Sequence, residues 1–453
     1  MPTNSFCIYP WVHIQVKPNG QAKPCCRFNH VQKEYLQTEY GHPLLKPYNV
    51  NYMSLSDIHK SKFWDKLRSD MLEGKTIPGC HKCDNDDKLG KFSMRSNANK
   101  EWNGLNQAVP IPSNKDIKIK YLELTTGRYC NLKCRTCSSD LSTTWESDDK
   151  VIKGLYTDSV SNNPRQEYSH LPKILDLNLP AEDFKETKLV KMTGGEPMIA
   201  PTFIPFIDII IEGGYAKNII LEIYTNTSWV PKDKILNRLK QFKFVKIFLS
   251  IDGIGEVNDY IRAPSEWDIV NESAETWIKF SKENKRFSIV FSPTISLYNI
   301  LNLSDMIKWW DNLQAKYFSK NFVLYATEGE KDAEINSEFI FNVGRFSPTM
   351  LQTPPYLSAS LLPNKTKIIE KLEKIKFEKT EWALSVDEVK YATRFKYVMD
   401  RMINTLQQKP LDNLETFINF SCDLDKLRNQ SLPKMLPELW NQMKDKVEYK
   451  GRV

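Results

Sequence analysis

Three cysteines near the middle of the chain have a spacing that suits an iron–sulfur cluster. Cys130, Cys134 and Cys137 lie in the segment GRYCNLKCRTC, with three residues between the first pair and two between the second. Three thiolates can bind three irons of one 4Fe–4S cube, and the fourth iron is then left without a protein ligand. Such an open iron can bind a substrate. A structural zinc site normally needs four ligands, and no fourth cysteine or histidine follows at close spacing.

The segment that must position these cysteines alternates short apolar strands with helical patterns. The expected strands are 121–126, 189–194, 220–226, 245–252, 287–293 and 322–327, and the expected helices between them include 202–212, 232–241 and 270–283. Repeated strand–helix units predict a parallel sheet with right-handed crossovers, either open or closed into a barrel. The cysteines follow the first strand directly. They are therefore expected at the C-terminal ends of the strands, where barrel active sites are built.

The regions on either side of this segment have different patterns. Near the N-terminus we expect a short strand at 12–16 and one helix at 58–72, whose apolar residues recur every four positions. The segment VPIPSN at 109–114 is typical of a linker, because its prolines disfavour helix. After about residue 363 the apolar spacing is mainly helical, which favours a packed, solvated helical cap over a dedicated binding module.

These patterns predict three parts and one insertion. The insertion covers 138–185 and has a loop-like start rich in Ser, Asp and Asn. The three parts are a cysteine-containing module at 1–108, a strand–helix core at 115–335 and a mainly helical region at 336–453.

Three more strand ends carry segments that could contact a ligand. The second strand ends in Gly194-Gly195-Glu196-Pro197, the third in Thr225-Asn226-Thr227, and the fourth in Ser250-Ile251-Asp252-Gly253. Glycines allow close approach of the backbone, and a carboxylate can accept a hydrogen bond from an ammonium group. Each segment alone would be an ordinary strand-to-loop turn. Their joint order behind the three cysteines makes coincidence improbable.

With its motifs in this order, the chain resembles the radical S-adenosylmethionine superfamily, whose signature is a C-x3-C-x2-C loop after the first barrel strand. The resemblance implies an α/β fold with a partial (β/α)6 TIM-like barrel. It also implies a 4Fe–4S cluster on Cys130, Cys134 and Cys137, with S-adenosylmethionine bound at the open iron. The residues implied to bind this cofactor are Gly194, Gly195, Glu196, Asn226, Ser250, Asp252 and Arg262.

Within this resemblance, the GGEP segment binds the amino group of the methionine moiety, and the serine of the S-x-D-G segment contacts the ribose. Arg262 matches a basic position that often follows that motif. Two positions depart from the family pattern. Thr227 stands where glycine is usual, and Thr136 stands where the family carries an aromatic residue against the adenine.

The implied reaction is reductive cleavage of S-adenosylmethionine to methionine and a 5′-deoxyadenosyl radical, which abstracts hydrogen from a substrate carbon. The cofactors carry out the cleavage that forms the radical, and the protein orients the reacting groups and excludes water. An electron donor such as flavodoxin or ferredoxin is expected as a partner. No further catalytic residue is assigned from the sequence.

A second resemblance covers the N-terminal cysteines. Cys7, Gly20 and Cys25 follow the C-x(9–15)-G-x4-C opening of the SPASM and twitch auxiliary-cluster modules, and Cys80 and Cys83 supply a later C-x2-C pair. The resemblance implies that these four cysteines hold one auxiliary 4Fe–4S cluster. In that family the module usually follows the barrel, whereas here it precedes it.

The ligands for a second auxiliary cluster are missing. A SPASM module would continue with cysteines at two positions that here hold Leu89 and Ser93, so a twitch-like module with one cluster fits better. A zinc site built from the same four cysteines remains the alternative. Cys26 and Cys422 are interpreted as small buried hydrophobic residues, not as ligands.

Composition sets limits on the location and the partners of the chain. The 453 residues carry a formal charge of +7 and 41% hydrophobic residues, and no apolar stretch is long enough to span a membrane. The N-terminus lacks the pattern of a secretory signal, so we expect a cytoplasmic protein with reduced cysteines. A charge this mild over this length indicates no nucleic-acid partner.

Three functions remain open on the sequence. The leading hypothesis is a radical enzyme of the oxidoreductase or peptide-modifying class that acts on a peptide or protein, because many relatives with auxiliary modules are peptide maturases. The second is dehydrogenation or rearrangement of a small polyol or sugar. The third is a structural iron–sulfur or zinc scaffold, which would have no need of the cofactor-contacting strand ends.

Overall fold

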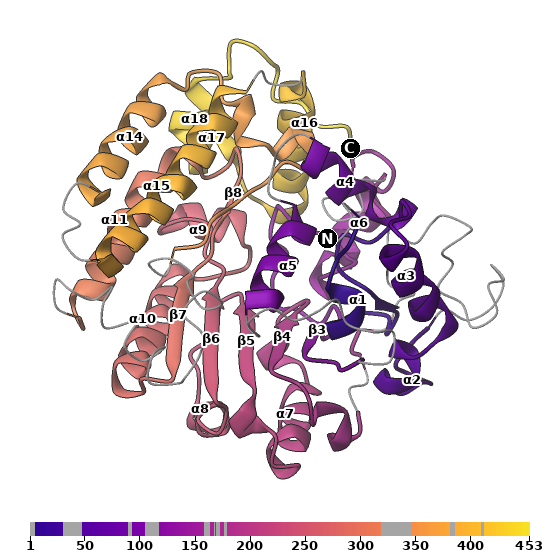
Figure 1. Ribbon diagram of the computed structural model, residues 1–453. Helices are drawn as coiled ribbons and strands as arrows, with labels where there is room; N and C mark the ends of the chain where they lie inside the picture. Colours follow the sequence, from indigo (N-terminus) through magenta and orange to yellow (C-terminus); the bar gives the residue numbers. More distant parts are fainter. Residues whose placement is uncertain are drawn as a thin grey trace.

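A seven-stranded sheet forms the centre of the molecule in the computed structural model (Figure 1). The structure describes residues 5–29, 48–88, 93–104, 117–157, 164–166, 168, 173–175, 179–318, 346–380, 386–408 and 412–453. The strand order is β2-β1-β3-β4-β5-β6-β7, and every neighbouring pair is parallel except β1 with β2. The strands are β1 (His13–Val16), β2 (Ala22–Lys23), β3 (Tyr121–Thr125), β4 (Leu189–Thr193), β5 (Ile220–Thr225), β6 (Phe244–Leu249) and β7 (Phe287–Phe291).

The strands β3 to β7 confirm five of the expected core strands, and the fold is the α/β class that the sequence predicts. The described strands form an open sheet. The sixth expected strand, at 322–327, and the linker at 109–114 lie outside the described residues. A separate two-stranded pair consists of β8 (Thr294–Ile295) and β9 (Thr349–Met350).

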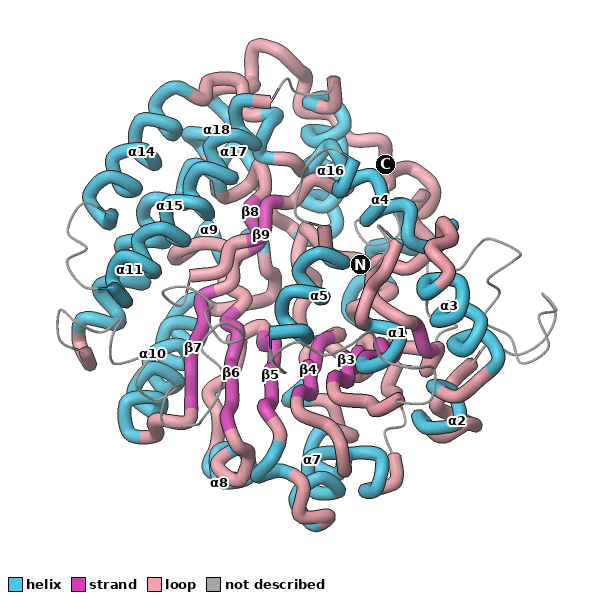
Figure 2. Tube along the Cα trace, viewed as in Figure 1, coloured by secondary structure: helices cyan, strands magenta, loops and turns pink. Residues whose placement is uncertain are grey.

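Helices follow the strands in sequence and surround the sheet (Figure 2). The expected helices correspond to α7 (Phe203–Glu212), α8 (Asp233–Leu239) and α10 (Trp267–Glu283), and α11 (Leu303–Ala315) follows β8. Alternate strand residues such as Leu122, Val190 and Leu221 are fully buried and form part of the main core. This apolar alternation is the physical reason for the strand positions, because side chains in a strand point to opposite faces in turn.

The other set of alternate residues carries charges. The register places Glu123, Lys191, Glu222 and Lys246 in one row across β3, β4, β5 and β6. Lys191 Nζ lies 3.1 Å from Glu123 Oε1, and Lys246 Nζ lies 3.7 Å from Glu222 Oε1. The signs alternate along the row, so neighbouring strands attract one another across this face of the sheet.

The N-terminal part packs against the edge of the same sheet. It contains α1 (Tyr9–Val12), α4 (His81–Lys88) and α5 (Met94–Gly104), and β1 confirms the strand expected near 12–16. The single helix expected at 58–72 is wrong, because the chain forms α2 (Leu55–His59) and α3 (Lys62–Leu72) instead. Ser61 adopts an extended backbone at the break, and the buried Arg68 guanidinium donates to the freed His59 carbonyl at 3.0 Å.

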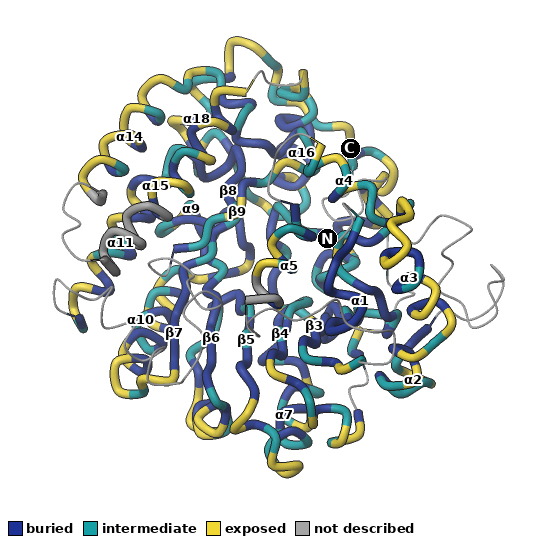
Figure 3. The backbone as a smooth tube through the Cα atoms, viewed as in Figure 1, coloured by how far each residue is buried: buried dark blue, intermediate teal, exposed yellow. Residues whose placement is uncertain are grey.

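The C-terminal region is mainly helical, as expected, with α14 (Thr366–Thr380), α15 (Val386–Gln407), α16 (Leu414–Arg428), α17 (Leu432–Met435) and α18 (Pro437–Asn441). The expectation of a solvated cap is wrong for α16, because every residue from Phe417 to Asp425 is buried (Figure 3). α16 packs against α6 (Glu146–Ile152), a helix of the 138–185 insertion. It is therefore a central element.

No helix in the described part of the chain combines the length and the apolar character that crossing a bilayer would require.

Candidate active site

The cysteine loop, defined here as residues 126–137, follows β3 directly. Cys134 is buried, and Cys130 and Cys137 are half-buried. Burial raises the pKa of the Cys130 thiol to about 12, and the neighbouring Cys134 adds to the rise. Burial also raises the pKa of Cys137, with contributions from Cys134, Asp140 and Cys130. The three predicted ligands therefore lie close enough together to influence one another.

The donor set of three thiolates fits three irons of a 4Fe–4S cube. Within the ranges that the structure describes, no three His, Cys, Asp or Glu side chains surround one point as they would around a single metal ion. In a 4Fe–4S cube each thiolate binds a different iron, so the sulfurs do not need to converge. The Leu132 amide donates a hydrogen bond to Cys130 Sγ at 3.4 Å, a contact that favours a thiolate at this position.

The glycines at the end of β4 allow contact with the cysteine loop. A Cβ atom on Gly195 would lie 2.2 Å from the Tyr129 carbonyl oxygen, and Gly194 has a φ of +131°. The Gly195 amide donates to the Gly127 carbonyl at 3.1 Å, and the Glu196 amide donates to the Tyr129 carbonyl at 2.8 Å. The two strand ends are thus held together through their backbones. This contact explains the glycines without any ligand.

The Glu196 side chain joins the end of β4 to the end of β5. It is fully buried. Its Oε1 accepts from Thr225 Oγ1 at 2.9 Å, and its Oε2 accepts from the Asn226 amide at 2.5 Å. Burial raises the pKa of Glu196 to about 7, although the hydrogen bonds from Asn226 and Thr225 oppose that rise. The carboxylate therefore fixes the position of the Thr225–Thr227 turn.

Asn226 extends this connection to the cysteine loop. Its Nδ2 donates to Asn131 Oδ1 at 2.8 Å and lies 3.8 Å from Cys130 Sγ. Its Oδ1 accepts from the Ser228 amide at 3.0 Å. Thr227, where the family pattern has glycine, adopts a left-handed φ of 63°. The turn therefore keeps a backbone conformation that favours glycine, even though a β-branched residue occupies it.

The end of β6 carries a buried ion pair close to the cysteines. Arg262 Nη1 lies 2.6 Å from Asp252 Oδ2, and Asp252 is fully buried. The Arg262 guanidinium opposes the rise that burial causes in the pKa of the Cys134 thiol, so it lies near that sulfur. Ser250 remains half-buried at the same strand end, and its amide donates to the Thr225 carbonyl at 2.9 Å.

The four N-terminal cysteines also come together, although their two pairs are far apart in sequence. Burial raises the pKa of Cys7 to about 12, and Cys83 contributes. Burial likewise raises the pKa of Cys25, and the neighbouring Cys26, Cys7 and Cys80 add to the rise. The two pairs, far apart in sequence, therefore lie in the same part of the fold.

The two spare cysteines differ from each other. Cys422 is buried in α16, which confirms its interpretation as a small core residue. Cys26 is exposed, so the expectation that it is buried is wrong. Its Sγ lies 3.6 Å from Met94 Sδ of α5. The adjacent Cys25 turns inward with the other three cysteines, which leaves Cys26 on the outside.

Sequence reasoning missed the arginines around these cysteines. Arg95 of α5 forms an ion pair with Asp84 of α4 at 2.5 Å and opposes the pKa rise of Cys7. Arg128 and Arg135 lie in the cysteine loop itself and are fully buried. The signal available in the sequence was the position of Arg128 and Arg135 beside the cysteines. Because a buried arginine requires a specific partner, that position could have indicated a charged contact at the site.

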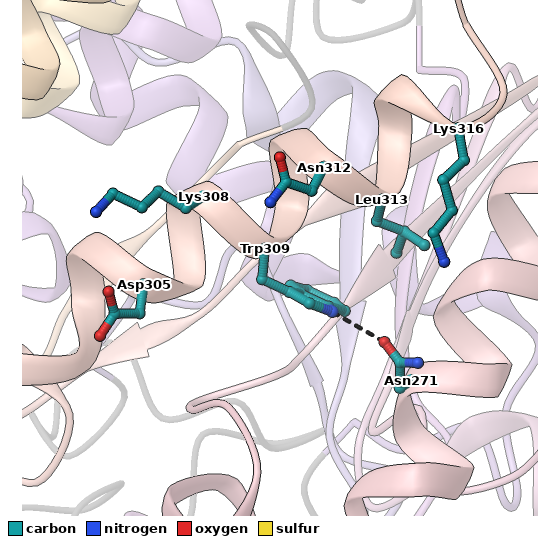
Figure 4. Close-up of a pocket in the computed structure, with 7 residues that line it drawn as sticks. All are labelled: Asn271, Asp305, Lys308, Trp309, Asn312, Leu313 and Lys316. Atoms are coloured by element: carbon teal, nitrogen blue, oxygen red, sulfur yellow. Dashed lines mark hydrogen bonds between the residues drawn. The ribbon is translucent and has the colours of Figure 1, made fainter.

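A cavity elsewhere in the molecule does not belong to this site. It has a volume of about 340 Å³ and lies between α10 and α11 (Figure 4). Trp309 donates from Nε1 to Asn271 Oδ1 at 2.9 Å across it. None of its lining residues belongs to the strand ends or to either cysteine group.

Comparison with known proteins supports the N-terminal module. Residues 7–84 match the model of SPASM, an iron–sulfur cluster-binding domain. This match confirms the SPASM-like module expected from Cys7, Cys25, Cys80 and Cys83. It ends before Leu89 and Ser93, the positions where a longer SPASM module would place further cysteines. No curated protein matches the chain.

Several solved structures are similar to parts of the chain. Native anSMEcpe with bound AdoMet is 17% identical with a TM-score of 0.34, over 57% of this chain and 61% of that one. Streptococcus suis SuiB bound to S-adenosylmethionine is 14% identical with a TM-score of 0.28, over 57% and 53%. SuiB bound to the precursor peptide SuiA is 13% identical with a TM-score of 0.29, over 60% and 62%.

The chain thus spans less than two thirds of the length of each of these proteins. The match over residues 7–84 agrees with the iron–sulfur module expected near the N-terminus.

Proposed function

We propose that this chain is a radical S-adenosylmethionine enzyme that modifies a peptide or protein. The observation that carries the proposal is the hydrogen-bonded connection from Cys130 through Asn226 to Glu196. It joins the cysteine loop, the GGEP segment and the Thr225–Thr227 turn at one edge of the sheet. A scaffold that only held metal would not need these strand ends to meet.

The residues fit the two groups that such an enzyme binds. Cys130, Cys134 and Cys137 would hold the cluster, and S-adenosylmethionine would lie over the ends of β4, β5 and β6. When bound, this pair supplies reductive cleavage of the cofactor and abstraction of hydrogen from the substrate. Gly194, Gly195, Glu196, Asn226, Ser250, Asp252 and Arg262 are the residues proposed to form the cofactor site.

The roles of these residues follow from their contacts. Glu196 acts as a positioning residue, because both of its oxygens already accept hydrogen bonds from the protein. Arg262 presents a buried cation beside Cys134, with its Nε free of hydrogen bonds to the described residues. The partly exposed Ser250 can offer its hydroxyl group to a ligand. Asp252 holds the Arg262 side chain in position through their buried ion pair.

The N-terminal module would hold one auxiliary cluster on Cys7, Cys25, Cys80 and Cys83. β1 of this module pairs with β3 of the core, so the auxiliary site and the cysteine loop are parts of one sheet-based unit. Peptide-modifying enzymes are the class we favour, because many enzymes that resemble this chain and carry such an auxiliary module are peptide maturases. Flavodoxin or ferredoxin would supply the electron.

The test is cofactor cleavage by the full chain, purified and reconstituted without oxygen and then reduced. The parent protein should form 5′-deoxyadenosine, and the triple variant C130A/C134A/C137A should form none. Cys422→Ala is the matched control, because it removes a buried cysteine outside both groups and should retain the product. Product formation by the triple variant at the parent rate would contradict the proposal.

A further inference from the structure

The last residue of α16 reaches the cysteine loop from the opposite end of the sequence. The Arg428 guanidinium lies over the Trp145 ring, 4.5 Å from its centroid. Trp145 is fully buried, and its Nε1 donates to the Cys134 carbonyl at 2.9 Å. Arg428 is therefore separated from the backbone of Cys134 by a single indole ring.

The charges around Arg428 do not balance. Its Nε lies 2.8 Å from Asp148 Oδ2, while Lys133 of the cysteine loop lies 3.1 Å from the other oxygen of the same carboxylate. One aspartate thus serves two cations. Arg428 and Asp148 are almost completely buried, with 2% and 4% of their side chains exposed. Lys133 keeps 22% of its side chain exposed, so Arg428 is the buried one of the two cations that share this carboxylate.

The hydrogen bonds of Arg428 are incomplete as well. Its Nη1 and Nη2 atoms are buried and have no hydrogen-bond partner among the described residues. Arg135 adds a second buried cation nearby, and burial together with this repulsion lowers the pKa of Arg428 to about 10. Two guanidinium nitrogens of Arg428 are thus left for an acceptor that the described residues do not supply.

We propose that Arg428 is a positioning residue that sets the reduction potential of the cluster held by the cysteine loop. The proposal rests on the function proposed above only in that this loop binds a 4Fe–4S cluster. Reduction adds one negative charge to a cluster, and a buried cation stabilises the more negative form. Arg428 therefore makes the cluster easier to reduce, and α16 becomes part of the redox centre.

The test is an anaerobic redox titration of the reconstituted full chain, followed by electron paramagnetic resonance. The signal that disappears in C130A/C134A/C137A belongs to this loop, so no S-adenosylmethionine is needed to identify it. For Arg428→Met, the ratio of reduced to oxidised cluster at a fixed potential should fall about tenfold, which corresponds to about 59 mV for one electron. Arg428→Lys, which keeps the charge, should stay close to the parent.

Asp148→Asn provides a test of opposite sign. It removes the carboxylate that Lys133 and Arg428 share, so the local charge becomes more positive and the midpoint potential should rise. Arg238→Met is the control, because Arg238 pairs with Asp208 near the surface and its midpoint should equal that of the parent.

These outcomes distinguish an effect of the Arg428 charge on the midpoint potential from a structural change in the cysteine loop. Arg428→Met with parental iron content and an unchanged midpoint would overturn the proposal. Shifts in the same direction for Arg428→Met and Asp148→Asn would also overturn it, since they would indicate distortion of the loop instead of a change in charge. If Arg428→Met fails to bind iron, Arg428→Lys and Asp148→Asn decide the question. If the cysteine loop of the parent binds no cluster, both proposals are refuted. If the midpoint potentials of Arg428→Met and Asp148→Asn shift in opposite directions but the parent does not cleave S-adenosylmethionine, only the proposed enzymatic function is refuted.

Discussion

Arg135, between the second and third cysteines of the cysteine loop, forms a buried ion pair with Asp425 of α16, although 290 residues separate them. The Arg135 guanidinium also stacks on the Tyr260 ring, 3.7 Å from its centroid, and its Nε donates to the Tyr260 carbonyl at 3.0 Å. The pair therefore ties the cysteine loop both to the core and to the C-terminal helices.

Breaking this pair should destabilise the whole fold. Asp425→Asn removes the counter-charge of a buried arginine, and such changes typically cost about 3–5 kcal/mol. The measurement is the free energy of unfolding from denaturant titration. Asp208→Asn, which breaks the more exposed pair with Arg238, should cost about 1 kcal/mol or less. Equal losses in the two variants would show that the buried pair has no special role.

Cofactor affinity should depend on the strand-end residues. Glu196→Ala frees the Thr225–Thr227 turn, and Ser250→Ala removes a hydroxyl group at the end of β6. Each should weaken binding of S-adenosylmethionine by about ten- to a hundredfold, the equivalent of roughly 1–3 kcal/mol for a lost polar contact. Isothermal titration of reconstituted protein measures this affinity, with iron content and circular dichroism as checks of integrity. Glu275→Ala, which removes a partly exposed partner of Lys316, should bind like the parent. Parental affinity in both strand-end variants would remove the assignment of the pocket.

The N-terminal cysteines should contribute half of the iron. Two 4Fe–4S cubes require about eight irons and eight sulfides per chain, because each cube holds four of each. C80A/C83A should lower the iron to about four and leave cofactor cleavage in the absence of substrate intact. Cys26→Ala is the control and should keep about eight. Zinc in the isolated protein, with iron limited to about four even after reconstitution, would favour the structural zinc site instead.

Stability should decrease in mild acid because of His59. Burial is the main cause that lowers the pKa of His59 to about 3, and repulsion from Arg68 is the second cause. The Nε2 atom of His59 donates to the Pro10 carbonyl at 2.9 Å. The unfolded chain binds a proton near pH 6.5 while the folded chain does not. Stability is therefore complete above pH 6.5 and falls as the pH decreases from 6.5 toward 3. By pH 5.5 the loss should be about 1.4 kcal/mol.

The contribution of His59 is measured as the difference between parent and His59→Gln, because acid also affects the clusters. The parent should lose more free energy of unfolding than the variant between pH 7.5 and 5.5. Identical profiles for the parent and His59→Gln would contradict this account.

Local patterns in the sequence predicted what depends on local chemistry. The apolar alternation predicted the five strands β3 to β7 to within three residues at each end, and the spacing of the cysteines indicated two groups. The break at Ser61 was missed because the apolar repeat of Phe63, Leu67 and Met71 begins only after it and does not mark where the helix starts. Arg68, in the next helix, donates a hydrogen bond to the His59 carbonyl at the end of α2.

Contacts between distant segments could not be predicted in this way. Nothing in the apolar spacing of 414–428 indicates that Arg428 ends beside Trp145 or that Asp425 reaches Arg135. The Glu196 carboxylate was expected to face a ligand, whereas its contacts are with the next strand end. Side chains with several possible partners are assigned only when the tertiary fold is known.

The parallel pairing of β1 with β3 has a consequence for the order of assembly. His13 lies opposite Tyr121, so β1 must wait until more than a hundred further residues have been synthesised before its main partner exists. Until then it can pair only with β2, and an isolated two-stranded ribbon is marginally stable in water. The N-terminal cysteines therefore reach their final arrangement only after the first core strand has been made, although they precede it in the chain.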